Sequence, residues 1–205
     1  MDDRDRARFV HDLYEFNDKN PTINNNRHAM IDLRGLSSRN KPRPRGKLVD
    51  IHGWCLMGNH YHLLLSEIVD GGLSKFLMKL NVGYAKYFNE RYTRTGTLFQ
   101  SRTKRVLITK DAHFLHILHY IHLNPLDFLE SASTWRSGKI ASTRSALAHL
   151  RSYRWSSYLD YCNKNNFPSI LTRDLFDDVF KDYSRQLEKF VRDMKFDSLQ
   201  EMTLE

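Results

Sequence analysis

The chain has 205 residues, of which 40% are apolar or aromatic, so its length suffices for one domain with a hydrophobic core and an extension. Its longest apolar runs are far shorter than the roughly 20 residues that cross a bilayer. Its charged start, MDDRDRARFV, is unlike a signal peptide, so we expect a cytoplasmic protein. Two cysteines without a Cys-x-x-Cys pair indicate neither a thiolate zinc site nor a disulfide framework.

Residues 2–19 are predicted to form a helix, because apolar side chains recur every three to four positions and Asn20-Pro21 would end it. Residues 21–47, rich in Asn, Arg, Pro and Ser, are predicted to be a long basic loop. Residues 48–69 predict two strands broken near Gly58-Asn59. An amphipathic helix is expected over about residues 73–91, and its tyrosines are expected to pack in the core.

The second half of the chain is less regular. Residues 104–109, KRVLIT, predict a short strand, and a helix is expected from Asp111 to Asn124, ended by Pro125. Residues 129–150 indicate an inserted loop or a weak helix, and RWSSY at 154–158 is an aromatic patch for which core packing is expected. A final amphipathic helix is predicted over about residues 172–194.

The formal net charge is +8, and an excess of Lys and Arg is typical of nucleic-acid binders, although many basic proteins bind no nucleic acid. The basic residues form two runs, which are Arg39, Lys41, Arg43, Arg45 and Lys47, and Arg91, Arg94, Arg102, Lys104 and Arg105. Such runs suit a surface that follows phosphates. We expect Arg94, Arg102, Lys104 and Arg105 to contact DNA, with a solvated basic face as the alternative.

Two histidines interrupt the apolar segment WCLMGNHYHLLL at residues 54–65. Because side chains alternate along a strand, His60 and His62 are expected on one face, with Tyr61 on the other. Two imidazoles on one face can share a metal ion. The alternative is that they are ordinary half-buried histidines.

The helix DAHFLHILHYIHLNP carries a second pair of candidate residues. At about 100° per residue, Asn124 lies about 40° from Tyr120, one turn further along the same face. Taken singly, Tyr120 could be a tyrosine at the edge of the core and Asn124 a helix-terminal residue. Taken with the histidines, the Asn124 amide oxygen could be a third metal ligand and Tyr120 would face the metal. A phenol has a pKa of about 10 and needs activation, and a metal that polarises a phosphodiester meets part of that need. A tyrosine beside a metal on a basic protein therefore suggests phosphoryl transfer on nucleic acid.

These segments resemble the single-tyrosine HUH transposases, in particular the REP-associated tyrosine transposase branch. WCLMGNHYHLLL, then GGLSKFLMKLNVGYAKYFNERYTRTGTLFQSRTKRVLI, HYIHLNP and YRWSSY occur in the family's order. The resemblance implies an α+β fold with a ferredoxin-like (RRM-like) antiparallel sheet and flanking helices. The transposase domain would cover 1–128, with 21–47 as an inserted basic loop, and 129–205 would be an insert and a helical C-terminal extension.

The resemblance also implies an activity. Tyr120 would cut single-stranded DNA, leaving a 5′-phosphotyrosine and a free 3′-hydroxyl, with His60, His62 and Asn124 as ligands of Mg²⁺ or Mn²⁺. The DNA would be a hairpin from a palindromic repeat, and no organic cofactor is implied.

The sequence departs from this family at its start, at two motif positions and in its two long inserts. The family usually opens with a strand that lies beside the histidine strand, whereas here the first strand is missing and the chain starts at the following helix. Without that strand, the histidine strand would have an unpaired edge, and we expect another segment or a dimer partner to cover it, unless the protein is a remnant. The protein is therefore expected to be a monomer or a homodimer. Gly58 stands where Pro is common, and LDFLES follows HLNP instead of a Val-Arg-Ala-Gly run.

Three functions therefore remain open. The first is a metal-dependent DNA transposase that nicks and rejoins DNA through Tyr120. The second is a catalytically degenerate remnant that binds DNA hairpins without cutting them. The third is a metal-dependent hydrolase of another substrate, in which Tyr120 is only structural.

Overall fold

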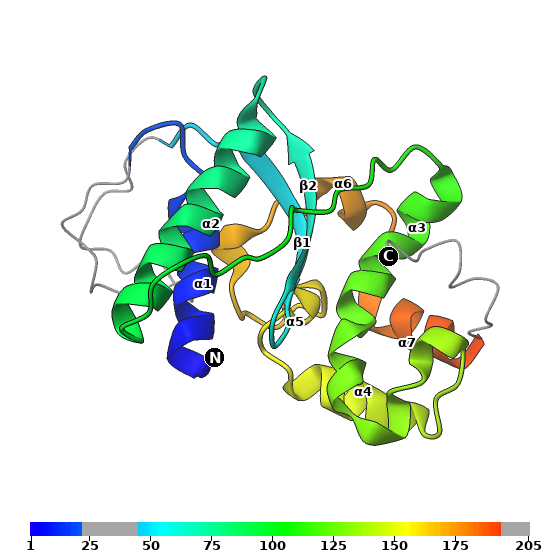
Figure 1. Ribbon diagram of the computed structural model, residues 1–205. Helices are drawn as coiled ribbons and strands as arrows, with labels where there is room; N and C mark the ends of the chain where they lie inside the picture. The colour runs from blue at the N-terminus through cyan, green and yellow to red at the C-terminus, as the bar shows by residue number, and fades with distance from the viewer. Residues whose placement is uncertain (22–44, 194–205) are drawn as a thin grey trace. The chain divides into compact units, whose positions relative to one another are not determined.

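The computed structural model describes residues 1–21 and 45–193, which form an α+β protein with one two-stranded sheet in that part of the chain (Figure 1). Strands β1 (Val49–Leu56) and β2 (Tyr61–Glu67) form an antiparallel hairpin. Its turn is closed by a hydrogen bond of 2.8 Å from the Met57 amide to the His60 carbonyl, so the predicted break at Gly58-Asn59 is confirmed. None of the helices in the described ranges is long and apolar enough to cross a bilayer.

The chain divides into two compact units that interleave along the sequence. The first unit contains the described residues of Met1–Ile51, Leu65–Lys104 and Phe167–Leu171. The second contains those of His52–Leu64, Arg105–Asn166 and 172–193. Each unit therefore contains a part of the hairpin and its own set of helices.

Helices α1 (Asp3–Glu15) and α2 (Gly72–Arg91) lie side by side in the first unit, where η5 (Pro168–Ile170) contacts α1 (Figure 1). The rings of Phe9 and Tyr84 meet edge to face, 5.1 Å apart, and both residues are buried. The core packing expected for Tyr84 is therefore confirmed. Gly83 permits the close approach, because a Cβ there would come within 2.3 Å of the Phe16 ring.

Helix α1 ends at Glu15, four residues before its predicted end. Asn17 explains this earlier end, because its side chain forms hydrogen bonds with the backbone at the start of β1. Its amide nitrogen donates to the Val49 carbonyl at 2.8 Å, and its oxygen accepts from the Leu48 and Val49 amides at 3.0 Å each. The chain consequently leaves the helix at Asn17 to reach the start of the hairpin.

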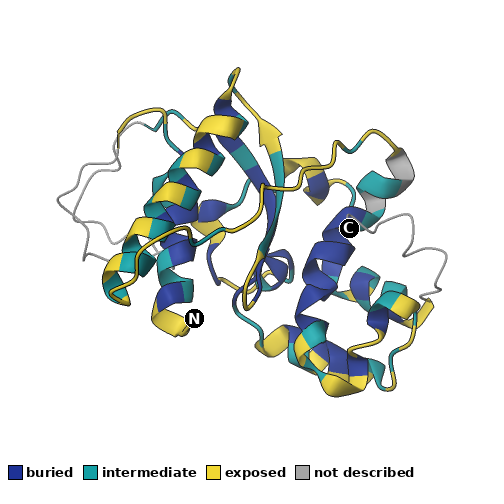
Figure 2. Ribbon diagram, in the orientation of Figure 1, coloured by how far each residue is buried: buried dark blue, intermediate teal, exposed yellow. Residues whose placement is uncertain are grey.

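The second unit is built around α3 (Asp111–Leu123), whose residues from Ile117 onward are buried (Figure 2). The shorter elements of this unit are η2 (Asn124–Phe128), η3 (Glu130–Ala132), η4 (Trp135–Ser137), α4 (Thr143–Ser152), α5 (Tyr158–Tyr161), α6 (Asp174–Asp177) and α7 (Tyr183–Asp193). The RWSSY patch pairs with the edge of β1 through a bridge between Ser156 and Cys55, and Trp155 and Tyr158 are buried. Core packing of this patch is thus confirmed.

Two predicted elements are wrong. Residues 104–109 form no strand, and Val106 and Leu107 are 51% and 83% exposed, because no strand lies beside them in the described chain to complete a ladder. The single helix predicted over 172–194 is broken into α6 and α7, because the Asp182 carboxylate accepts from the Arg185 amide at 3.1 Å and starts a new helix. Most of the predicted loop 21–47, including Arg39, Lys41 and Arg43, and the end of the final helix at Met194 lie outside the described residues.

Candidate active site

The hairpin brings the two predicted histidines together. His60 lies in the turn just before β2 and His62 is the second residue of β2, and their ring centroids are 5.0 Å apart at an interplanar angle of 82°. The His60 Nδ1 atom lies 2.8 Å from the Asn59 Oδ1 atom, which can only accept, so the His60 Nδ1–H donates and its Nε2 keeps a lone pair. The pairing inferred from strand alternation is present, although only His62 belongs to the strand.

His62 is held in its neutral form. Burial, and then the neighbouring His60 and Arg136, lower the pKa of His62 to about 4. Its Nε2 atom is buried and has no hydrogen-bond partner among the described residues. A neutral imidazole with a free nitrogen is the form that binds a metal.

Helix α3 places Tyr120 against His62. The helix packs closely on β1 at Gly53, where a Cβ would come within 2.7 Å of the Leu118 side chain. Tyr120 is 1% exposed, and its ring centroid lies 6.1 Å from that of His62 at 87°. Its hydroxyl is buried, and no residue of the described ranges forms a hydrogen bond with it. A buried hydroxyl without a partner is costly and is rarely left in a folded protein without a reason.

Asn124 lies at the end of the same helix, one turn beyond Tyr120, as predicted. Its amide nitrogen donates to the Tyr120 carbonyl at 2.8 Å, which orients the carboxamide. Its oxygen accepts from Arg136 Nη2 at 2.7 Å. The oxygen proposed as a third metal ligand therefore already has one partner, and only its second lone pair remains.

Sequence reasoning missed three residues of this site, Asp127, Trp135 and Arg136. Arg136 forms an ion pair with the Asp127 carboxylate, which also accepts from the Trp135 indole at 2.8 Å. Burial lowers the pKa of Arg136, but Asp127 and the Tyr120 hydroxyl outweigh it and leave that pKa above its ordinary value. The only local signal was a Trp-Arg pair in a segment without periodicity.

The donor set fits a divalent cation in part. Two imidazoles suit Mn²⁺ and similar metals, and the remaining lone pair of the Asn124 oxygen suits a hard cation. Within residues 1–21 and 45–193, no three His, Cys, Asp or Glu side chains come together as a metal site. The role of Asn124 as the third ligand stays a prediction.

The residues predicted to contact DNA are exposed. Arg102, Lys104 and Arg105 are open to solvent, and Arg94 lies over the Phe88 ring, 5.7 Å from its centroid. By contrast, Arg91 of the same basic run is bound to the carboxylates of Asp2 and Asp5. Only part of this run is therefore free to meet phosphates.

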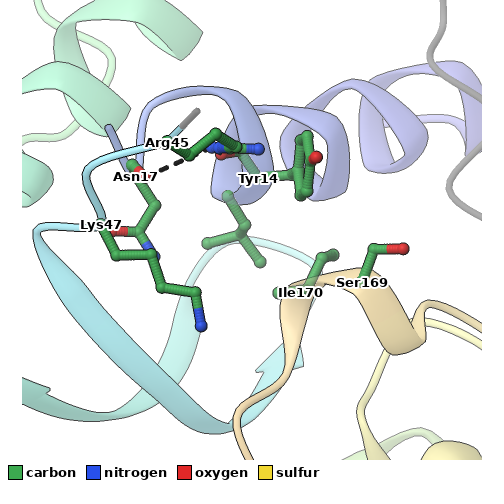
Figure 3. Close-up of a pocket in the computed structure, with 7 residues that line it drawn as sticks. Tyr14, Asn17, Arg45, Lys47, Ser169 and Ile170 are labelled. Carbon is green, nitrogen blue, oxygen red and sulfur yellow. Dashed lines mark hydrogen bonds between the residues drawn. The ribbon is translucent and has the colours of Figure 1, made fainter. Parts of the chain in front are cut away.

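A hollow in the first unit, lined in part by Tyr14, Arg45 and Lys47, is a poorer candidate (Figure 3). Its volume of about 210 Å³ is below the range of roughly 300–1,000 Å³ that small-molecule sites occupy. Arg45 is bound to the Tyr14 carbonyl and lies 3.7 Å from the centroid of the Tyr14 ring. The Arg45 guanidinium therefore stabilises the end of α1.

Comparisons with models of protein families, with curated proteins and with solved structures find no match to this chain.

Proposed function

We propose that the protein is a metal-dependent nuclease and strand transferase that cuts single-stranded or hairpin DNA through Tyr120. The observation that carries this proposal is the meeting of His60, His62 and Tyr120 in one unit, with ring centroids 5.0 and 6.1 Å apart. The resemblance to REP-associated tyrosine transposases and the net charge of +8 support DNA as the substrate.

The proposed reaction exchanges one phosphodiester for another. The Tyr120 oxygen attacks a backbone phosphorus and loses its proton, the bond from phosphorus to the 3′ oxygen breaks, and that oxygen takes up a proton. The products are a 5′-phosphotyrosine and a 3′-hydroxyl. Attack by another 3′-hydroxyl would reverse the exchange and join two strands.

Each residue has a distinct task in this scheme. His60 and His62, with Asn124 as a third ligand, would hold Mg²⁺ or Mn²⁺, which when bound polarises the phosphate for attack. Asn124 also fixes the turn of helix that carries the nucleophile, because its amide nitrogen binds the Tyr120 carbonyl. Close packing around Tyr120 limits the rotation of its ring and so orients the oxygen.

The scaffold is part of the proposal. The two-stranded sheet of the described residues, with its flanking helices, is compatible with part of a ferredoxin-like sheet. The proposal places β2 beside the position that the family's first strand would take. A strand from a second copy or another segment would then complete the sheet.

A covalent adduct on DNA tests the proposed activity. The protein is incubated with Mn²⁺ or Mg²⁺ and end-labelled hairpin single strands, and the products are separated on a denaturing gel. We expect a protein-linked label with the native chain and with Tyr153→Phe, a matched loss of a hydroxyl in the same unit. Tyr120→Phe should give no adduct. An adduct that persists in Tyr120→Phe, or no adduct from the native chain with either metal, would overturn the proposal.

A second candidate is a hairpin-binding protein without nuclease activity. It is favoured by one observation, that the Asn124 oxygen is bound to the Arg136 guanidinium. Tight, salt-sensitive hairpin binding without an adduct under either metal would identify this function.

A further inference from the structure

Arg136 is held rigidly beside the nucleophile. It lies in η4, where its guanidinium contacts the Trp135 ring at 4.5 Å from the centroid. One nitrogen, Nη1, pairs with Asp127, and the other, Nη2, donates to the Asn124 oxygen at 2.7 Å. Asp127 is itself fixed by the Trp135 indole. The orientation of the guanidinium is therefore set before any ligand arrives.

Three polar atoms of this site lack hydrogen-bond partners in the described chain. They are the Arg136 Nε, the Tyr120 hydroxyl and the His62 Nε2, and all three are buried. Arg136 binds Asn124, whose amide nitrogen donates to the Tyr120 carbonyl, and the ring centroid of Tyr120 lies 5.5 Å from that of Trp135 and 6.1 Å from that of His62. The Tyr120 hydroxyl lies close enough to the guanidinium to raise the pKa of Arg136, although the two groups do not meet the distance and angle criteria of a hydrogen bond.

The chemistry of these groups points to an anion. A buried N–H of a guanidinium needs an acceptor, because leaving it without one costs the full desolvation penalty of the group. Guanidinium groups pair best with carboxylate and phosphate oxygens, which match their planar fork. Asp127, the carboxylate that pairs with Arg136, is already shared with Trp135. The remaining donor suits an oxygen from outside the protein.

We propose that Arg136 is a catalytic residue that binds a non-bridging oxygen of the phosphate attacked by Tyr120. This inference rests on the proposed function and adds a fixed protein cation to the site. The guanidinium would neutralise the charge that develops on the phosphate as the phenol oxygen bonds to phosphorus.

The position of Arg136 has a second consequence for the metal. Its positive charge and its hydrogen bond to Asn124 both oppose a cation at the same oxygen. Removing the guanidinium should therefore tighten metal binding while it slows the reaction. Loss of a residue that only supported the fold would lower both the metal affinity and the reaction rate. Tighter metal binding together with a slower reaction therefore identifies the proposed role.

The first readout compares Arg136→Gln with Arg144→Gln, a matched loss of charge at an exposed position of α4 in the same unit. Single-turnover adduct formation with hairpin DNA is followed at saturating Mn²⁺, and Mn²⁺ affinity is measured by titration calorimetry. We expect Arg136→Gln to slow adduct formation roughly 100-fold and to bind Mn²⁺ at least as tightly as the native chain. Arg144→Gln should match the native chain in both. An unchanged rate in Arg136→Gln overturns the inference.

The second readout does not depend on nuclease activity. Inorganic phosphate is added without DNA or metal, and the melting temperature is recorded. We expect phosphate to raise it in the native chain and in Arg144→Gln but not in Arg136→Gln. If the native chain forms no adduct, the proposed function fails, and this readout still decides whether Arg136 binds an anion. An equal phosphate effect in the native chain and in Arg136→Gln, or no effect in either, overturns the inference.

A third variant tests whether the effects of Arg136→Gln arise from misfolding. Arg136→Lys keeps the charge opposite Asp127, so we expect it to fold and to retain part of the phosphate response. Lysine lacks the planar fork, so the rate should fall by about 10-fold. A native rate in Arg136→Lys would overturn the role of the fork.

Discussion

A polar cluster centres on Arg91 in the first unit and on Arg136 in the second, and the two clusters differ in how many hydrogen bonds they leave unmade. In the first unit, Arg91 binds Asp2 and Asp5, and the hydroxyls of Tyr87 and Tyr92 both donate to Asp5, at 3.1 and 2.7 Å. In the second unit, Arg136 binds Asp127 and Asn124, but its Nε and the nearby Tyr120 hydroxyl have no partner in the described ranges.

The difference indicates which cluster supports the fold and which serves a ligand. A polar cluster whose members satisfy one another is stabilising and has little capacity left for binding. A cluster with unmade hydrogen bonds carries a cost that folding alone does not explain, and such sites are often functional. We therefore expect changes in the Arg91 cluster to alter stability, and changes in the Arg136 cluster to alter chemistry.

The largest expected effect on stability comes from Asp5, whose carboxylate is completely buried. In Asp5→Ala, the two tyrosine hydroxyls and the Arg91 guanidinium lose an acceptor, and α1 loses half of its capping box. We expect the free energy of unfolding to fall by about 3 kcal/mol, measured by urea denaturation. Adduct formation below the melting temperature should stay unchanged.

Asp3→Ala is the matched control for this change. Asp3 lies in the same first turn of α1, but its side chain is 77% exposed and pairs with Arg6, one turn away. Its loss should cost well under 1 kcal/mol. Equal destabilisation by the two substitutions would show that the Arg91 cluster contributes no more than the helix start.

Histidines of the second unit make its stability depend on pH. Burial lowers the pKa of His119 to about 3, and both of its ring nitrogens lack partners in the described part of the chain. Its ring stacks on those of Tyr183 and Phe190. Above pH 6.5 His119 is neutral in the folded and unfolded chains. As the pH falls from 6.5 towards 3, only the unfolded chain takes up the proton, so stability declines.

This dependence can be removed by His119→Phe. At pH 5 the protonation of His119 in the unfolded chain costs about 2 kcal/mol, and at pH 7 almost nothing. We therefore expect His119→Phe to flatten the decline between pH 7 and pH 5 by about 2 kcal/mol, measured by denaturation at both values. If the native chain and the variant decline equally, His119 is not buried as described.

The sequence predicted those parts of the site that depend on local periodicity. Strand alternation paired His60 with His62, and helical geometry paired Tyr120 with Asn124, because the members of each pair are only two or four residues apart in the sequence. The residue that binds Asn124 could not be found in this way. Arg136 lies twelve residues further on, in a segment without a period, and its approach depends on how that segment packs against α3.

The secondary-structure predictions that were wrong also depended on contacts between segments that are distant in the sequence. Residues 104–109 contain the β-branched and apolar residues of a strand, but a strand forms only where a neighbouring strand supplies hydrogen bonds, and none lies beside them in the described chain. Similarly, nothing in the sequence near Asn17 indicated that its side chain would bind the backbone of β1 and end the first helix early.

The smallest expected effect on stability distinguishes the two clusters most directly, because it compares the loss of a tyrosine hydroxyl from each of them. Tyr87→Phe removes a hydroxyl that donates to Asp5 and accepts from Arg91, so we expect it to cost about 1 kcal/mol. Tyr120→Phe removes a hydroxyl that makes no hydrogen bond with any described residue, so the free energy of unfolding should stay the same or rise. Urea denaturation of both variants measures the difference. A loss of 1 kcal/mol in Tyr120→Phe would mean that this hydroxyl has a partner within the protein, and the site would then lose the free oxygen that the proposed reaction requires.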